Sequence, residues 1–146
     1  MSSREPDLRL GGFSLWVHRW ERPDSQDYSD GNWLVVTAMY RSAGASVTVE
    51  GPILHSPDVS RFRNQCEALY EFLRGSAEFD SLDAGFKIVL SSNDYGRIGM
   101  TVDITPDIAD EQHRFRSEID QSYLPDVIKG LNTILQSFAP RGRPET

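Results

Sequence analysis

The amino-acid sequence predicts an α+β fold, with a single curved antiparallel sheet of about six strands and two amphipathic helices packed on one face. Three observations predict this class. Short segments alternate apolar residues with a period of two, which is typical of strands. Two longer segments repeat apolar residues at spacings of three and four, as amphipathic helices do. The order is therefore β-β-β-α-β-β-β-α, and the short turns between neighbouring strands favour antiparallel pairing.

The first third of the chain contains three predicted strands. In the first, Phe13, Leu15 and Val17 alternate with the residues between them. The second is rich in β-branched and aromatic residues, which is the composition of a strand buried on both faces. Gly44 lies between the second and the third, consistent with a short hairpin connection. The three strands are predicted at about residues 13–18, 33–40 and 46–53.

The first predicted helix begins at Ser56. Serine suits the N-cap, Pro57 suits the first helical position, and the early acid Asp58 suits the N-terminal end of the helix dipole. Gly75 is predicted to end the helix. The apolar face consists of Val59, Phe62, Cys66, Leu69, Tyr70 and Leu73.

The second half of the chain contains three more predicted strands and a closing helix. The strands are predicted at about residues 86–91, 98–104 and 112–119, with a turn at Asn93-Asp94-Tyr95-Gly96. The helix is predicted from about Tyr123 to Phe138, and Pro140 ends it. Its apolar stripe consists of Leu124, Val127, Ile128, Leu131, Ile134, Leu135 and Phe138.

The length of 146 residues predicts one domain, ordered over about residues 7–140 with flexible ends. No apolar run approaches the roughly 20 residues that cross a bilayer, and the N-terminal residues lack the apolar core of a signal peptide. We therefore expect a cytoplasmic protein. A single cysteine, Cys66, excludes an intrachain disulfide and suits a packing role. A monomer and a weak homodimer both agree with the sequence.

The formal net charge of −7 favours a basic partner through long-range electrostatic steering. The same charge disfavours nucleic acid, because nucleic-acid affinity depends largely on lysine and arginine neutralising phosphates. We expect a protein partner rather than a nucleic acid or a membrane.

Catalytic signatures are missing from the sequence. It contains no phosphate-binding loop, no dinucleotide-binding glycine fingerprint and no nucleophile elbow. The three histidines lack the spacing of a metal site on one element, so we expect no metal and no other cofactor. For an enzyme, Asp30, His18 and His113 are the acid–base candidates, but nothing in the sequence shows that they meet. A binding function is favoured over catalysis.

The segment before the second strand contains Asp24, Asp27, Asp30 and Asn32, and it has two interpretations. A calcium site would use their oxygens, but the spacing differs from that of an EF-hand loop and no glutamate provides bidentate closure. A solvated turn is favoured, in which Gly31 is expected because glycine tolerates a positive φ.

Acidic residues gather at two further places, residues 78–83 and 103–111. Such groups are either a solubilising surface or a docking face for a basic protein. Trp20, near the end of its strand and flanked by charged residues, is the tryptophan that we expect to be partly exposed. The residues of the first group are Glu78, Asp80 and Asp83. The candidate partner contacts are Asp103, Asp107, Asp110, Glu111 and Trp20.

Four segments occur together in one order: Asp30-Gly31-Asn32-Trp33-Leu34, Leu69-Tyr70-Glu71-Phe72-Leu73, Asn93-Asp94-Tyr95-Gly96-Arg97-Ile98 and Leu131-Asn132-Thr133-Ile134-Leu135. In this order the chain resembles the WapI-type immunity proteins of contact-dependent bacterial toxin systems. The resemblance implies a non-enzymatic antidote that binds and blocks a nuclease-like toxin domain made by the same cell. It also implies that Asp30, Gly31, Asn32 and Trp33 form a structural motif. The alternative is a small-molecule or peptide binding module, with a cleft near Trp16, Trp20 and His18.

Overall fold

A computed structural model describes residues 4–81, 85–93, 96–107 and 109–144. Within these residues, each half of the chain forms a four-stranded antiparallel sheet followed by a helix. The first sheet contains β1 (Leu8–Leu10), β2 (Phe13–Trp20), β3 (Trp33–Arg41) and β4 (Ser46–His55), and α1 (Ser56–Phe72) follows it. The second contains β5 (Ser76–Asp80), β6 (Phe86–Ser92), β7 (Arg97–Asp107) and β8 (Glu111–Asp120), and a short 3-10 turn, η1 (Gln121–Tyr123), leads into α2 (Leu124–Ser137).

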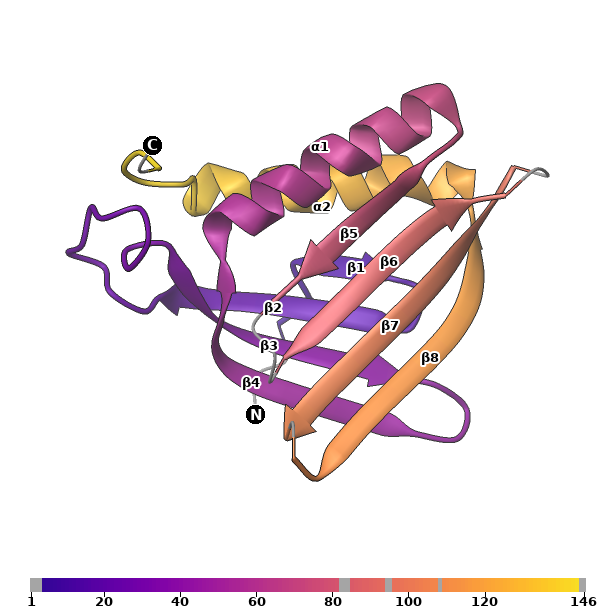
Figure 1. The fold of residues 1–146 in the computed structure, drawn as a ribbon, viewed down its shortest axis with the longest axis horizontal. Helices are drawn as coiled ribbons and strands as arrows, with labels where there is room; N and C mark the ends of the chain where they lie inside the picture. Colours follow the sequence, from indigo (N-terminus) through magenta and orange to yellow (C-terminus); the bar gives the residue numbers. More distant parts are fainter. Residues whose placement is uncertain (1–3, 82–84, 94–95, 108, 145–146) are drawn as a thin grey trace.

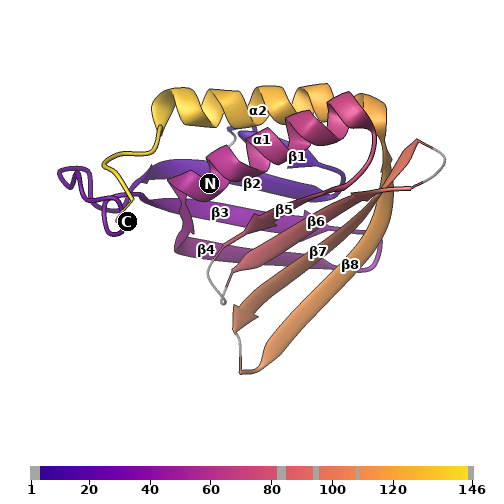
Figure 2. The ribbon, with the colours of Figure 1, turned by 45° about the horizontal axis from the view of Figure 1, so that its top comes forward.

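The two sheets pack against each other with their strands running in different directions, and both helices lie side by side along one edge of the pair (Figures 1 and 2). Helix α1 contacts the edge strand β5, whereas α2 contacts the edge strand β1. Strand β4 contacts β7, so the inner faces of the two sheets enclose the core. The helices close this core on the side where both edge strands lie.

The α+β class and the antiparallel pairing are confirmed, but the prediction of a single sheet of about six strands is wrong. Strand β1 has three residues, too few for an alternating pattern to stand out. Strand β5 is absent from the predicted strands because it overlaps the first acidic group, although Ala77 and Phe79 are buried while Ser76 and Glu78 are exposed. Helix α1 then carries the chain from β4 to β5, and these two strands do not pair, so the strands divide into two sheets.

A row of four phenylalanines joins the layers of the core. Phe13 of β2 contacts Phe86 of β6, with ring centroids 5.1 Å apart. Phe79 of β5 lies edge-on to Phe86 at 5.2 Å and stacks on Phe62 of α1 at 4.6 Å. All four side chains are buried within one continuous apolar cluster. Aromatic contacts of this kind add to the free energy of burial and fix the relative positions of the first sheet, the second sheet and α1.

Both predicted helices are present, but the ends of α1 differ in detail from expectation. The N-cap is His55 rather than Ser56, and Ser56 is buried, where its hydroxyl donates to the carbonyl oxygen of Phe138 at 2.5 Å. The helix ends on Leu73, a non-glycine residue with φ 54°, before Gly75 is reached. In the described part of the chain, no helix has both the length and the apolar character needed to span a membrane.

Cys66 lies on the buried face of α1, and burial raises the pKa of its thiol to about 12 because the thiolate is poorly solvated there. We expect Ellman's reagent to leave Cys66 unmodified in the folded protein at pH 8 and to modify it fully in urea. In the unfolded chain the thiol ionises near its ordinary pKa of about 8.5, so stability should fall as pH rises from there toward 12. Rapid modification without denaturant would contradict the buried position.

Three residues of the sequence analysis lie outside the described residues. These are Asp83 of the first acidic group, and Asp94 and Tyr95 of the turn between β6 and β7.

Candidate functional site

The loop between β2 and β3, residues 21–32, is held in place by the buried side chain of Asn32. The side-chain amide nitrogen of Asn32 donates to the carbonyl oxygens of Tyr28 and Arg141, both at 2.9 Å. Its side-chain oxygen accepts from the backbone N–H of Arg141 at 2.8 Å. Asn32 is fully buried, so its side-chain amide depends on these backbone groups for its hydrogen bonds. The motif residue therefore joins the β2–β3 loop to the segment after α2.

Arg141 follows α2 and lies just beyond residues 7–140, the range that the sequence predicts to be ordered. Its guanidinium donates through Nε to the carbonyl oxygen of Gly31 at 3.0 Å, and Nη2 donates to the same oxygen. Nη1 donates to the carbonyl oxygen of Pro23 at 2.7 Å, and Nη2 to that of Arg22 at 2.8 Å. The guanidinium carbon lies 3.9 Å from the centroid of the Trp20 ring. Three carbonyl oxygens and one aromatic face thus surround a single planar cation.

Trp20 is half-buried, and its ring has two neighbours from the chain after α2 begins. The ring of Phe138 meets it edge-on, with centroids 5.4 Å apart. The guanidinium of Arg141 lies over it. Trp16 and His18 are the other residues of the proposed small-molecule cleft. Both lie on β2, and each contacts a different segment. The Trp16 indole N–H donates to the carbonyl oxygen of Arg4 at 2.9 Å, and a His18 ring nitrogen lies 2.8 Å from the Thr37 hydroxyl.

Gly31 is required for space. The expectation that it needs a positive φ is wrong, because Gly31 is not among the glycines with positive φ. A Cβ at this position would lie 2.5 Å from the carbonyl oxygen of Asp27 and 2.8 Å from the hydroxyl oxygen of Ser25. The Asp27 carboxylate in turn accepts from the backbone N–H of Asp30 at 2.7 Å. The loop folds back closely on itself at Gly31, which leaves no room for a side chain.

Among the described residues, the side chains named for a calcium site and those named for acid–base catalysis do not come together. Asn32 directs its amide toward backbone groups, as described above, and no cluster of three or more His, Cys, Asp or Glu side chains suited to a metal occurs in the described ranges. His18 contacts Thr37 on the first sheet, whereas a ring nitrogen of His113 lies 3.2 Å from Glu111 on the second. Asp30 is exposed in the β2–β3 loop. These three candidates occupy different elements.

His55 ties the other side of the loop to β4. Its Nε2 lies 3.2 Å from the carbonyl oxygens of both Tyr28 and Ser29. The His55 ring also packs against Trp33, with centroids 4.6 Å apart, and edge-on against Tyr28 at 5.8 Å. Trp33 thus contacts His55, which in turn contacts the carbonyl oxygens of the loop.

Asp80 of the first acidic group lies at the same end of the second sheet as the second acidic group. Antiparallel order places the end of β5, the start of β6, the end of β7 and the start of β8 at the same end. Register confirms this, because Asp80 pairs with Lys87, Lys87 with Asp103, and Asp103 with Arg114. We call this region the acidic end; it consists of Asp80, Asp103, Asp107, Asp110 and Glu111.

The acids of the acidic end differ in how far they are neutralised. Arg114 donates through Nε and Nη2 to both carboxylate oxygens of Asp103, at 2.7 and 3.2 Å, and this contact raises the pKa of Arg114. Asp107 accepts from the backbone N–H of Ala109 at 2.9 Å, and Asp110 is exposed. Within the described ranges, no lysine or arginine forms an ion pair with Asp107, Asp110 or Glu111. The negative charge is therefore concentrated at the β7–β8 tip.

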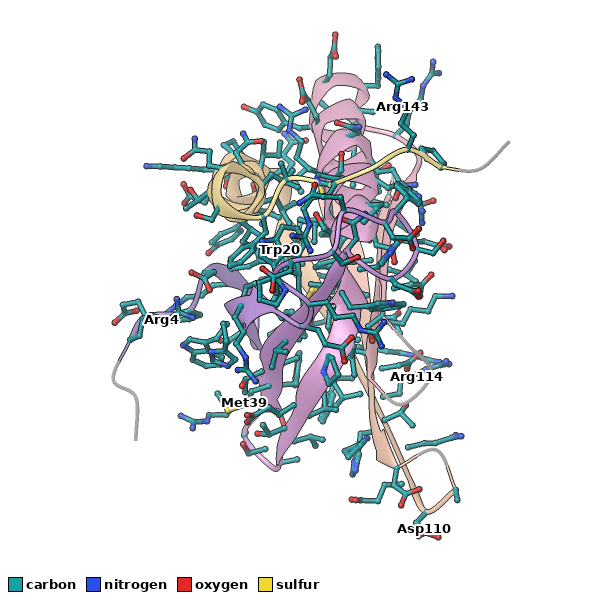
Figure 3. All side chains as sticks on the ribbon, turned by 90° about the vertical axis from the view of Figure 1, so that its left-hand side faces the viewer. Arg4, Trp20, Met39, Asp110, Arg114 and Arg143 are labelled. Carbon is teal, nitrogen blue, oxygen red and sulfur yellow. The ribbon has the colours of Figure 1, made fainter. Side chains whose placement is uncertain are left out.

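The candidate partner contacts consequently fall into two separate regions. Figure 3 shows Trp20 beneath the helices, Arg143 higher up beside α1, and Asp110 at the far tip of the β7–β8 hairpin. Asp103, Asp107, Asp110 and Glu111 all belong to that hairpin. Trp20 belongs instead to the β2–β3 loop region.

Comparisons with known proteins give one structure of similar fold and a family. A comparison with curated proteins gave no match. The crystal structure of WHY1 from Arabidopsis thaliana has a TM-score of 0.51 and 12% identity, covering 90% of this chain and 87% of that one. The crystal structure of WHY3 from Arabidopsis thaliana has a TM-score of 0.47 and 10% identity, covering 90% of this chain and 85% of that one. At 12% identity, the likeness to WHY1 shows the fold alone. The immunity protein WapI-like family matches residues 7–139, and the chain therefore belongs to this family.

Proposed function

We propose that this chain is a non-enzymatic immunity protein that neutralises a basic, nuclease-like toxin domain by binding it. Membership of the immunity protein WapI-like family is the observation that carries the proposal. The formal net charge of −7 suits a basic partner, and a toxin that acts on nucleic acid tends to be basic. Neutralisation by binding requires a surface, and it requires no catalytic group.

The acidic end supports electrostatic docking of such a partner. Its members come from β5, β7 and β8 and from the β7–β8 turn, yet they lie at one end of one sheet. Complementary charge of this kind raises the association rate and disfavours partners of the wrong charge. We assign the first encounter with the toxin domain to the acidic end.

Growth rescue tests the proposal. The chain is co-expressed with the C-terminal domain of whichever large secreted protein is encoded beside it. We expect cells to grow at the rate of cells without toxin, and we expect the two proteins to copurify. A toxin domain from an unrelated system should still arrest growth, which controls for a general effect on expression. Arrest by the neighbouring toxin domain in the presence of folded immunity protein, with no copurification, would refute the proposal.

A further inference from the structure

Trp20 and the β2–β3 loop form a binding site for a guanidinium group. We call this site the arginine cage; it consists of the Trp20 ring and the carbonyl oxygens of Arg22, Pro23 and Gly31. All three oxygens accept from one guanidinium, which also stacks on the Trp20 ring at 3.9 Å. A planar fork with several N–H donors fills such a site, whereas a lysine ammonium cannot both stack on the ring and donate in the plane. The chemistry of the cage is therefore selective for arginine.

The loop that forms the cage is acidic. Residues 21–32 contain four acids and one base, Arg22, whose Nε lies 3.8 Å from its neighbour Glu21. Asp24 and Asp30 are exposed, as is Asp27. The segment bound to this loop is basic, since Arg141 fills the cage and Arg143 follows two positions later in the chain. The chain's own tail thus shows which kind of ligand the loop accepts: a basic peptide with an arginine side chain.

The hydrogen bonds of Arg141 fall into two independent sets. The backbone N–H and carbonyl oxygen of Arg141 bond to the side chain of Asn32. The guanidinium bonds to the cage. The side chain can therefore leave the cage by a change of rotamer while the backbone stays attached to Asn32. Arg141 is only partly buried, so this movement does not require the core to open.

We propose that the arginine cage recognises an arginine of the basic protein partner, and that Arg141 occupies the cage until this partner replaces it. The proposal rests on the proposed function for the identity of the partner, and on the cage geometry for the ligand class. Exchange keeps the hydrogen bonds of the carbonyl oxygens and the contact with Trp20, because one guanidinium replaces another. Since Arg141 is tethered, its effective concentration is high, and an incoming arginine succeeds only as part of a larger interface. The exchange therefore selects for a partner that also engages the protein elsewhere.

A ligand titration of the Arg141→Ala variant tests the cage without any toxin. The ligand is N-acetyl-arginine amide, and the readout is the indole N–H signal of Trp20 in a nitrogen-15 correlation spectrum, assigned with Trp20→Phe. We expect a saturable shift in the variant and a midpoint at least about tenfold higher in the unaltered protein, where Arg141 competes. N-acetyl-lysine amide should leave the signal unchanged. Equal response to both ligands, or equal midpoints in both proteins, would overturn the cage as an arginine site.

The Arg141→Lys variant covers the case in which Arg141→Ala fails to fold. It retains the tail, its charge and its backbone bonds to Asn32, while it loses the planar fork. N-acetyl-arginine amide should then shift the Trp20 signal at a lower concentration than in the unaltered protein. A response no stronger than that of the unaltered protein contradicts the proposal.

The partner step is tested by affinity for the toxin domain. Arg141→Ala should bind about tenfold more tightly than the unaltered protein, because no tethered side chain has to be replaced. Unchanged or weaker affinity, in a variant that binds N-acetyl-arginine amide, would overturn the exchange. If the unaltered protein does not bind the toxin domain at all, the proposed function fails, and the titration still decides whether the cage binds arginine.

Discussion

Replacing Asn32 by alanine should lower the free energy of unfolding by about 3 kcal/mol. The substitution leaves the backbone N–H and carbonyl oxygen of Arg141 without the Asn32 side chain, which is fully buried, and it removes the Asn32 donor from the Tyr28 carbonyl oxygen, which keeps its contact with His55. Buried polar groups that lose a hydrogen bond cost roughly 1–3 kcal/mol each, and part of this cost is recovered when water enters the loop.

Urea denaturation followed by tryptophan fluorescence measures this effect. Urea is preferable to guanidinium chloride here, because guanidinium is itself the ligand class of the arginine cage. The matched control is Asn64→Ala on the exposed side of α1, where the side chain accepts only from the neighbouring Arg63 at 3.1 Å. We expect the control to change stability by less than about 0.5 kcal/mol. A loss below about 1 kcal/mol in Asn32→Ala would show that the loop and the tail do not depend on this side chain.

Removing charge from the β7–β8 tip should weaken binding of the toxin domain by about tenfold to a hundredfold at low salt. The variant combines Asp107→Asn with Asp110→Lys. Asparagine keeps the oxygen that accepts from the backbone N–H of Ala109, so the turn is preserved while the charge is lost. Most of the change should appear in the association rate, because Asp110 is exposed and acts through its long-range field.

The control for this prediction makes the same change in formal net charge elsewhere. Glu71→Lys and Asp126→Asn lie on the exposed surfaces of α1 and α2. Stopped-flow association rates at several salt concentrations compare the two variants. The difference between them should shrink as salt rises, since exposed charges are screened beyond about 10 Å at 0.1 M. Equal rates for both variants would mean that net charge alone matters and that the acidic end has no special role.

The helices and six of the strands could be predicted because each has a periodic pattern that is visible within its own segment. Both helices and strands β2, β3, β4, β6, β7 and β8 lie close to the predicted positions. Strands β1 and β5 have no such local signal, since β1 is short and β5 contains two acids among its five residues. Division into two sheets depends on which strands pair across α1, and that information is not contained in any one segment.

The candidate site shows the same contrast. The sequence identified the acidic residues of two segments, and antiparallel register then placed them at one end of one sheet. Arg141 lies just outside the range predicted to be ordered, because its contacts are carbonyl oxygens 110 to 119 positions earlier in the chain. Every residue has a backbone carbonyl, so the sequence does not show which of them accept hydrogen bonds from Arg141. The charged neighbours of Trp20 predicted its partial exposure, but nothing in the sequence predicted that Arg141 would lie over its ring.

The contact between Asn32 and Arg141 also has a consequence for synthesis. During translation, the β2–β3 loop emerges from the ribosome long before residue 141, and until then it lacks the partner for its buried amide. Any surface formed by this loop therefore matures after α2, whereas the β2–β3–β4 meander can form earlier from neighbouring segments. A ribosome-bound chain that stops before residue 141 should be more sensitive to protease between residues 21 and 32 than a released chain. Protection of the β2–β3 loop should therefore appear only once residue 141 can reach it.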